Sequence, residues 1–347
     1  MIFVKGSEAD FIKFVKNISK KDKVAIISHN DNDGVISGIL LEKFLESQNI
    51  SPVSINFTDI KVGMLDKFTS EFKTKKISKV FISDISIDTI DSESFSKFTS
   101  EFDTFLIDHH PLNSQFKDSP NIIKTDDGFC SGYVMYSLGK NFCNLDDLIL
   151  LTCTSIISDM VYKTDECAKF IKKYYPSFNP ELVAESVPGK LSRQIASSLI
   201  YFVGKEKKVY EILVLGNYKL LEKYHKLVDE EIQLWAKKFD NDAESFPEKK
   251  LFIFSIKPKF NIGSIVATIV SLRNPESSVI VSYPLDKNFL RVNARNQSGK
   301  KDMNLLMKNC TKGIPLASGG GHPKASGGRV PIKDFDIFKK RLLDGFE

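Results

Sequence analysis

Residues 24–47 read VAIISHNDNDGVISGILLEKFLES, and this stretch decides the fold class. The short apolar run Val24–His29 predicts a buried strand that ends in polar residues. Gly34–Ser47 then carries apolar residues at helical spacing (Ile36, Ile39, Leu40 and Phe44). The same alternation recurs with strand candidates at Val53–Phe57, Val80–Ile85 and Phe105–Ile107. Strands that alternate with helices predict an α/β domain whose parallel sheet is covered on both faces.

The pattern changes in the second half of the chain. Lys, Glu and Leu dominate residues 165–245, and Lys219–Lys238 is a long amphipathic stretch, which we interpret as helices connecting two domains. We expect the boundary in Asp240–Lys250. A smaller α/β unit is predicted beyond it, with the elements Leu251–Ile256 (strand), Ile262–Leu272 (helix), Val279–Tyr283 (strand) and Phe289–Ala294 (strand). The predicted divisions are 1–170, 171–245 and 246–347.

Composition excludes several classes of protein. The chain has 347 residues, 42% of them hydrophobic, with 27 Phe, so it can form two domains with cores and is not disordered. No apolar run approaches the roughly 20 residues of a membrane span, and we expect no membrane contact. The start Met1–Lys5 is not followed by a signal-peptide pattern. The five cysteines are odd in number and form no CxxC pair, which favours a reduced, cytoplasmic protein without a cysteine zinc site.

The net charge of +5 is unevenly distributed. Residues 251–347 carry 16 Lys and Arg against 7 Asp and Glu, a balance of +9, whereas the first 250 residues have a balance of −4. A basic domain beside a slightly acidic one indicates an anionic partner for the basic part. A lysine-rich solvated surface explains the charge equally well.

Four acidic or histidine clusters follow predicted elements. They are His29-Asn30-Asp31-Asn32-Asp33-Gly34, Asp84, Asp108-His109-His110 and, at the end of the apolar helix predicted for Leu145–Met160, Asp159. Three of them follow strands, and ligands bind at the carboxyl ends of the strands of an open parallel sheet. Each cluster also has a plain structural interpretation: a turn for the first, a strand end or helix cap for Asp84, a surface pair for the histidines and a solvated helix end for Asp159.

So many carboxylates in one place require cations to neutralise them. Oxygen ligands mixed with imidazole favour Mn²⁺ or Mg²⁺. Two such ions about 3.5–4 Å apart, bridged by one carboxylate, are a common arrangement for the hydrolysis of phosphate esters. Asp84 is the natural bridge, because it lies between the other groups.

The basic domain adds a glycine-rich stretch at residues 319–328, GGGHPKASGG. Gly319, Gly320 and Gly321 could bring backbone N–H groups close to a phosphate, and a helix starting after His322 would add its positive end. A tight turn is the alternative. Upstream, Arg291, Asn293 and Arg295 alternate along a predicted strand and would share a face able to bind phosphates bidentately. An ordinary exposed strand face is the alternative there.

Taken together, these residues resemble the DHH phosphoesterase family. Asp108-His109-His110 matches the motif that names the family, and the clusters at Asp31–Gly34, Asp84 and Asp159 match its other motifs in order and approximate spacing. Gly319–His322 is similar to the signature of the DHH-associated C-terminal domain. The resemblance covers roughly residues 20–170 and 250–335, and it implies an N-terminal DHH domain and a C-terminal DHH-associated domain with the active site in the cleft between them.

The resemblance also implies roles for single residues. Its metal ligands would be His29, Asp31, Asp33, Asp84, His109 and Asp159, around two Mn²⁺ ions for which Mg²⁺ could substitute. Asp108 would orient His109, and His110 would face the scissile phosphate. Arg291, Asn293, Arg295, the three glycines and His322 would bind the nucleotide.

The compact form of the first motif resembles the archaeal RecJ-like branch. That branch implies an Mn²⁺-dependent exonuclease acting on single-stranded DNA or RNA, in DNA repair or replication. Two rivals remain: a nanoRNase or cyclic-dinucleotide phosphodiesterase, and a replication scaffold with a GINS-like partner and secondary nuclease activity. The sequence does not decide the polarity of cleavage or the oligomeric state.

Overall fold

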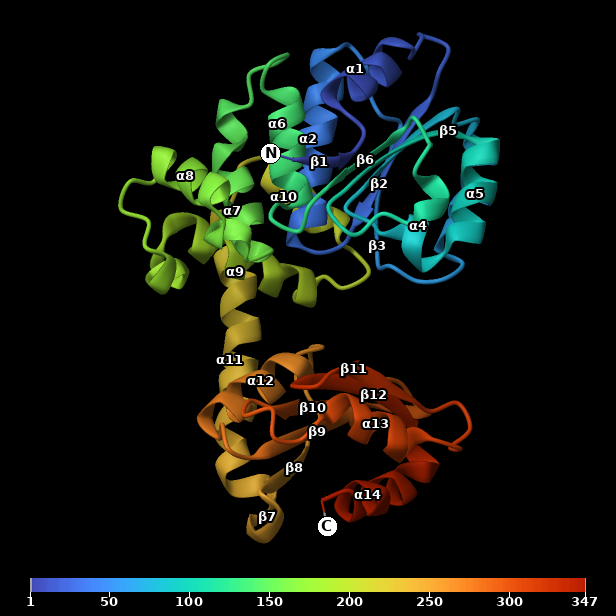
Figure 1. The fold of residues 1–347 in the computed structure, drawn as a ribbon. Coiled ribbons are helices and arrows are strands. Elements are labelled where there is room, and N and C mark those ends of the chain that lie inside the picture. Colours follow the sequence, from blue (N-terminus) through green and yellow to red (C-terminus); the bar gives the residue numbers. More distant parts are fainter. Residues whose placement is uncertain (1, 347) are drawn as a thin grey trace. The chain divides into compact units, whose positions relative to one another are not determined.

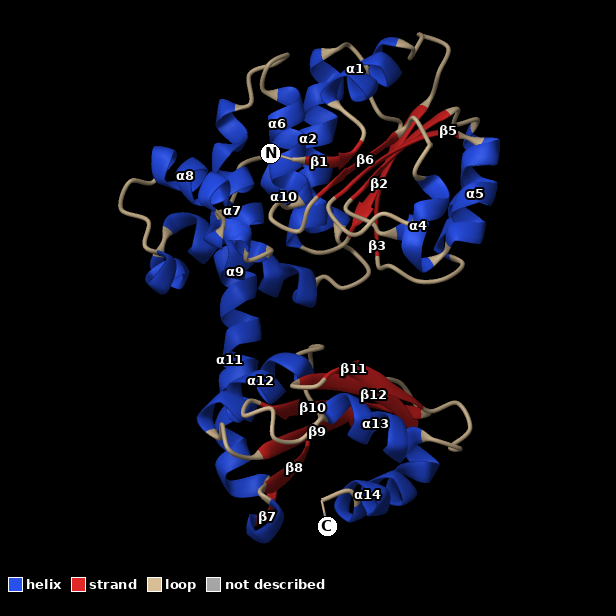
Figure 2. Cartoon of the chain, in the orientation of Figure 1, coloured by secondary structure: helices blue, strands red, loops and turns tan. Residues whose placement is uncertain are grey.

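The computed structural model describes residues 2–346, which form two compact units, Met1–His225 and Lys226–Glu347. Each unit contains a six-stranded sheet with helices packed on it (Figures 1 and 2). The predicted α/β class is therefore confirmed, with one sheet in each unit. No helix among the described residues combines the length and apolar character that crossing a bilayer requires.

The sheet of the first unit has the order β1-β6-β5-β4-β2-β3. Its strands are β1 (Phe3–Lys5), β2 (Val24–His29), β3 (Ser54–Thr58), β4 (Lys79–Ser83), β5 (Asp103–Asp108) and β6 (Ile122–Thr125). β2 to β6 pair in parallel, as predicted, and β1 adds an antiparallel edge beside β6. The chain leaves β2 toward β3 and returns to place β4 on the other side of β2. This reversal of direction lies between β2 and β4, and it is the place where open α/β sheets bind ligands.

Helices cover both faces of this sheet. On one face lie α1 (Glu8–Lys16), α2 (Asn32–Ser47), α6 (Ser131–Gly139), α7 (Ile149–Ser158), α8 (Asp165–Tyr174), α9 (Val187–Tyr201) and α10 (Lys207–Val214). On the other lie α3 (Met64–Lys75), α4 (Ile87–Ile90) and α5 (Ser92–Glu101). The first face is rich in phenylalanine: Phe11 of α1 is fully buried with its ring centroid 5.0 Å from that of Phe44. The helix predicted at Leu145–Met160 is the α-helix α7, preceded by a 3₁₀ turn at Asp146–Leu148.

The stretch predicted as a connector is helical. Its helices α9 and α10 bury Ile195, Val209 and Leu213 in the same core as α2. The amphipathic stretch predicted at Lys219–Lys238 is α11 (Lys219–Asp242), within which the first unit gives way to the second. The domain boundaries at 170 and 245 stay a prediction.

The sheet of the second unit has the order β11-β12-β10-β9-β8-β7. Its strands are β7 (Glu244–Phe246), β8 (Leu251–Ser255), β9 (Ser278–Pro284), β10 (Phe289–Asn296), β11 (Ser318–His322) and β12 (Ala325–Pro331). Only β8 and β9 pair in parallel. The helices α13 (Met303–Thr311) and α14 (Phe335–Asp344) pack on one face, around Val292 and Ala294 of β10. On the opposite face, α12 (Gly263–Arg273) packs so closely that a Cβ at Gly263 would lie 2.0 Å from the ring of Tyr283.

One sequence prediction about this unit is wrong. No helix starts after His322; the glycines 319–321 lie in the edge strand β11, which pairs antiparallel with β12 through a tight connection at Pro323 and Lys324. The backbone N–H of Gly321 donates to Asn304 Oδ1 at 3.1 Å. Any anion near these glycines would therefore meet a strand edge, without the positive end of a helix.

Candidate metal centre

The carboxyl ends of β2, β4 and β5 lie level in the sheet. Ser28 pairs with Ser83, and Ser83 pairs with Ile107, so the residues that follow these three positions emerge side by side. They belong to three of the four clusters identified from the sequence. Since parallel strands end at one sheet edge, the local sequence order suffices to bring them together.

The first cluster is a tight turn from β2 into α2. Asp31 is the N-cap of α2: its Oδ1 accepts the N–H of Gly34 at 2.9 Å, and its Oδ2 lies 2.9 Å from His29 Nδ1. A Cβ at Gly34 would lie 2.3 Å from the carbonyl oxygen of His29, so only glycine fits this turn. The turn interpretation and the ligand interpretation of this motif are thus compatible.

Asp33 is fully buried at the start of another helix. Its carboxylate accepts the N–H groups of Ser131 at 2.7 Å and Gly132 at 2.8 Å, the first residues of α6, and also the hydroxyl of Ser155. The residue before α6, Cys130, caps nothing with its side chain, so Asp33 takes that part from a distant point of the sequence. These contacts fix the orientation of Asp33 without any metal.

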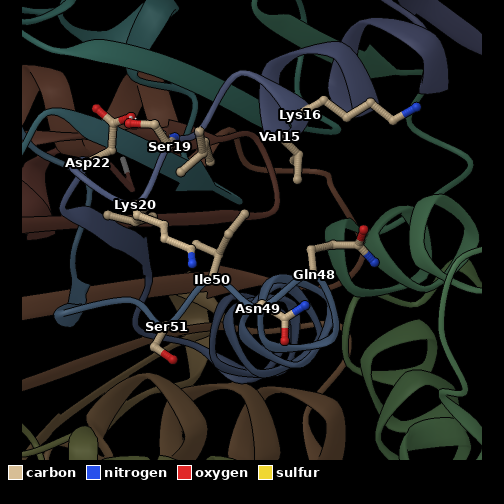
Figure 3. A pocket seen from close by; sticks show the side chains of 11 residues that line it. Val15, Lys16, Ser19, Lys20, Asp22, Gln48, Asn49, Ile50 and Ser51 are labelled. Atoms are coloured by element: carbon tan, nitrogen blue, oxygen red, sulfur yellow. Dashed lines mark hydrogen bonds between the residues drawn. The ribbon is translucent and has the colours of Figure 1, made fainter.

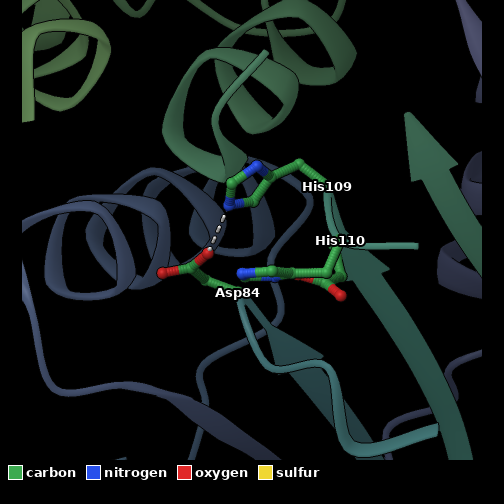
Figure 4. Close-up of side chains that lie close together, drawn as sticks. Asp84, His109 and His110 are labelled. Atoms are coloured by element: carbon green, nitrogen blue, oxygen red, sulfur yellow. Dashed lines mark hydrogen bonds and ion pairs between the residues drawn. The ribbon is translucent and has the colours of Figure 1, made fainter. Parts of the chain in front are cut away.

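Asp84 occupies the centre of the site and has an unusual backbone. Its φ is +60°, a left-handed conformation that non-glycine residues rarely adopt, and its N–H donates to Ile107 O at 2.9 Å. Asp84 Oδ1 accepts the hydroxyl of Ser131 at 3.0 Å and lies 3.3 Å from His109 Nε2 (Figure 4). Its Oδ2 lies 3.7 Å from His29 Nδ1. A strained residue at this point fits a functional constraint better than a solvated strand end.

Asp159 reaches the same place from α7, of which it is the C-cap. Its Oδ2 lies 3.3 Å from His109 Nε2, so one imidazole nitrogen faces both Asp84 and Asp159. The next residue, Met160, also has a positive φ of 60°. All six residues predicted to be metal ligands therefore lie close together in the structure.

The partner of Asp108 differs from the one that the resemblance implied. Asp108 Oδ1 lies 2.8 Å from Nδ1 of His110, so it orients His110 and not His109. The physical reason is that the two histidines point in different directions: Figure 4 shows His109 turned toward Asp84. The side chain of His110 remains 38% exposed, and its other nitrogen is available to a substrate.

Sequence reasoning missed two buried charges behind Asp108. Lys124 of β6 is fully buried, and its Nζ lies 2.5 Å from Asp108 Oδ2 and 2.8 Å from Asp88 Oδ1. The signal for Lys124 was its position inside an apolar strand, next to Ile122 and Ile123. Ser131, Gly132 and Ser155, which hold Asp33, were also missed; small residues at the start of an apolar helix were their signal.

The electrostatics show how crowded the centre is without a cation. Burial and the charges of Asp159 and Asp84 raise the pKa of Asp33 well above its usual range. Burial, then the charge of Asp84, raises the pKa of Asp159 to about 7. Burial also disfavours charge on Asp84, but hydrogen bonds from His109 and His29 outweigh it and hold the pKa of Asp84 well below its usual range. One carboxylate thus stays ionised while its neighbours retain protons.

The imidazoles hold protons for the complementary reason. Burial alone would lower the pKa of His29, but its hydrogen bonds to Asp31 and Asp84 raise it to about 10. Burial is likewise outweighed at His109, where the hydrogen bond to Asp84 and the charge of Asp33 raise the pKa to about 10. For Asp108, the hydrogen bond from His110 and the charge of Lys124 outweigh burial, and its pKa lies below its usual range.

These groups fit a divalent metal centre. Three sets of side chains each bring their ligand atoms within 4.8 Å of one another: Asp84 with Asp108, His109 and His110; His29 with Asp31 and Asp84; and Asp33 with His109 and Asp159. Oxygen donors with imidazole nitrogens suit Mn²⁺ or Mg²⁺. Cations would replace the protons that the carboxylates and imidazoles now share.

The residues predicted to bind substrate in the second unit fall into two groups. On β10, Arg291 is exposed, and Asn293 is buried with its Nδ2 lacking a hydrogen-bond partner among the described residues. Arg295 is turned onto α12, where its Nε donates to Thr268 Oγ1 at 3.3 Å and its NH2 to Ser264 Oγ at 2.8 Å. Its NH1 donates to the carbonyl oxygens of Ala294 and Ser326. A bidentate grip on phosphate is thus open to Arg291 but not to Arg295 as it stands.

The largest pocket described lies away from this chemistry. It has a volume of about 630 Å³ and is lined by residues such as Lys16, Asp22 and Asn49 (Figure 3). Its lining includes Val24, the first residue of β2, whereas His29 is the last. The pocket therefore opens at the amino ends of the strands and holds none of the candidate ligands.

Comparison with known proteins gives the fold its relatives. No protein-family model and no curated protein sequence is similar to the chain. Among solved structures, the exonuclease RecJ bound to manganese matches with a TM-score of 0.75 at 13% identity, over 100% of this chain and 95% of RecJ. The DHH domain of a member of a family of ribosomal proteins matches at 0.67 and 18%, over 98% and 88%. CDC45 from Entamoeba histolytica matches at 0.55 and 11%, over 98% of both chains. The chain therefore has the two-domain fold of RecJ and DHH-domain proteins, as the sequence resemblance implied.

Proposed function

We propose that this chain is a metal-dependent phosphodiesterase of the DHH phosphoesterase family, acting as a RecJ-like exonuclease on single-stranded DNA or RNA. The observation that carries the proposal is the gathering of six oxygen and imidazole donors around Asp84 at the sheet edge. The fold shared with manganese-bound RecJ supports it. Structural charge networks rarely combine a left-handed aspartate with carboxylates whose pKa values are driven apart, whereas hydrolytic centres commonly do.

The ligands would be His29, Asp31, Asp33, Asp84, His109 and Asp159, holding two Mn²⁺ ions or Mg²⁺ in their place. Bound divalent cations would lower the pKa of a bound water and stabilise charge on phosphate oxygens. The chain itself does the rest. The α6 N–H groups and Ser155 hold Asp33, and the turn at Gly34 fixes the separation of His29 from Asp31.

His110 is the group placed to touch the substrate. Its Nδ1 is held by Asp108, and its ring is partly exposed beside the metal ligand His109, 4.3 Å between ring centroids. From there it can donate a hydrogen bond to a phosphate oxygen or a proton to the departing hydroxyl. Asp108, buried and charged, keeps the ring in that orientation.

Binding of the nucleotide is assigned to the second unit. The balance of +9 over residues 251–347, the exposed Arg291 and the free Nδ2 of Asn293 support this assignment. Gly319, Gly320 and Gly321 would present an accessible strand edge, with His322 exposed at its end. A single strand bound mainly through its backbone would show affinity that falls steeply with salt.

A test of activity separates this function from its nearest rival. Purified protein with Mn²⁺ is incubated with end-labelled DNA and RNA single strands, long and short, and with cyclic dinucleotides. Progressive shortening of long strands supports the exonuclease. Consumption of dinucleotides or very short strands alone would transfer the proposal to a nanoRNase or cyclic-dinucleotide phosphodiesterase. Absence of hydrolysis on every phosphodiester would refute the enzyme.

A role as a replication-complex component, with a GINS-like partner, is the second candidate, and the fold shared with CDC45 favours it. The variant Asp84→Asn distinguishes it, because this change removes a metal ligand and leaves the surface of the molecule unchanged. Partner capture retained by a variant without nuclease activity would support the scaffold. The matched control is Asp103→Asn, at the opposite end of β5 from Asp108.

A further inference from the structure

Lys124 is a fully buried ammonium that the proposed chemistry does not use. It lies directly opposite Asp108 in the pairing of β5 with β6, and both side chains are 0% exposed. Its Nζ bridges Asp108 Oδ2 at 2.5 Å and Asp88 Oδ1 at 2.8 Å, and Asp88 is itself fully buried. A buried ammonium is costly unless anions pair with it closely, so this arrangement requires all three groups.

Asp88 ties this charge to the loop that carries the histidines. Its Oδ2 accepts the N–H of Asn113 at 3.0 Å, and Asn113 Nδ2 returns a hydrogen bond to the carbonyl oxygen of Asp88 at 2.9 Å. The next residue, Thr89, donates its hydroxyl to Pro111 O at 3.1 Å. The segment that follows His110 is therefore fastened to α4.

The helix α4 in turn begins three residues after Asp84. Lys124 thus links two segments that deliver different parts of the site: the one after β4, with Asp84, and the one after β5, with His109 and His110. The link ends on the imidazole itself, because Asp108 uses its second oxygen, Oδ1, to hold His110 Nδ1 at 2.8 Å.

We propose that Lys124 is a positioning residue for His110: its ammonium holds one oxygen of Asp108 so that the other stays aimed at the imidazole. The inference rests on the proposed function for its effect on rate, but its structural content does not. Without the ammonium, nothing in this bridge keeps Asp108 Oδ2 in place, and the carboxylate can turn away from His110. Partners that orient catalytic or metal-bound groups from behind typically account for about 10–100-fold in activity.

The test compares Lys124→Met with two other variants. Methionine has a similar length and no charge, so it removes the bridge with little change in volume. Asp88→Asn combined with Lys124→Met removes one anion and one cation together, which protects the fold if the single variant fails to form. The control Lys79→Met breaks an ion pair with Asp103 at the other end of β5.

Two readouts are taken on each variant. The first is the kcat and KM for hydrolysis of a single strand with Mn²⁺: we expect kcat to fall about 10–100-fold in both Lys124 variants, with KM and Mn²⁺ affinity within a few-fold of the starting protein. The second is the ring ¹⁵N spectrum of His110, assigned by its loss in His110→Gln. We expect the signal of the hydrogen-bonded Nδ1 to shift in both Lys124 variants and to stay unchanged in Lys79→Met.

Each outcome decides the inference. A folded Lys124→Met protein with unchanged kcat and unchanged His110 signals would overturn it. Return of kcat and of the His110 signal in the double variant would also overturn it, because Lys124 would then serve only to balance charge. If the unaltered protein hydrolyses no phosphodiester, the proposed function fails, and the His110 spectrum alone decides whether Lys124 positions the ring.

Discussion

Binding of Mn²⁺ should expel protons from the protein, and the number can be worked out from the site. At pH 7 both His29 and His109 carry a proton, because the pKa of each is raised to about 10. Metal ligation requires the neutral imidazole, so two protons must leave. Asp159, with a pKa raised to about 7, contributes about half a proton, and Asp33, raised further, contributes up to one more. We expect about two to four protons per protein molecule.

The same count sets the pH dependence of affinity. Each displaced proton changes the apparent affinity tenfold per pH unit, so two protons over the two units from pH 6 to pH 8 give about 10⁴-fold, or about 5 kcal/mol. Affinity rises with pH. The protons are counted by calorimetry in two buffers of different ionisation enthalpy, because the difference in heat is proportional to the protons released.

The stability of the metal-free protein should move in the opposite direction. A folded-state pKa that lies above the unfolded value contributes stability that is complete below the unfolded pKa and lost as pH rises through the folded one. For Asp159 this loss runs from about pH 4 to about 7, and for the two histidines from about 6.5 to about 10. Melting temperature should therefore fall between pH 6 and 9, and the increment from Mn²⁺ should grow. Release of less than one proton, with affinity independent of pH, would refute the reasoning; His29→Asn should lower the count by about one.

Three further changes test separate parts of the structure. Gly34→Ala places a Cβ 2.3 Å from the carbonyl oxygen of His29 and should abolish high-affinity Mn²⁺ binding, measured by titration; wild-type affinity would contradict the tight turn. Phe11→Ala removes a fully buried ring and should lower the free energy of unfolding by about 3–5 kcal/mol in urea; a loss under 1 kcal/mol would show that the core is not packed as described. Arg291→Met should raise KM for a single strand several-fold with kcat retained, whereas Arg295→Met should chiefly lower the melting temperature, because Arg295 joins β10 to α12; the reverse pattern would assign substrate binding to Arg295.

The parts of the fold that the sequence predicted are those that depend on local pattern. Val24–His29 is the strand that its apolar run predicts, and the helix predicted from Gly34 begins two residues earlier, at Asn32. Because the sheet is parallel, knowing that strands precede Asp84 and Asp108 was enough to place these residues at one edge. The clustering of the candidate ligands therefore needed no knowledge of distant contacts.

The parts that were missed or wrong depend on pairing between distant segments. A lysine in a strand is usually exposed, so nothing local showed that Lys124 lies buried between two aspartates. The glycines before His322 have no periodicity of their own, and only pairing with Ala325–Pro331 makes them a strand. Likewise Arg295 shares a strand face with Arg291, but its position against α12 is set by Ser264.

The most direct test of the central claim is the initial rate at which the protein with Mn²⁺ shortens an end-labelled single strand, measured beside Asp84→Asn. Asparagine tolerates the left-handed backbone at this position, so the variant should keep its fold. We predict Mn²⁺-dependent hydrolysis by the unaltered protein and a loss of at least about 10²–10³-fold in the variant. No hydrolysis by the unaltered protein, or equal rates for both, would contradict a phosphodiesterase centred on Asp84.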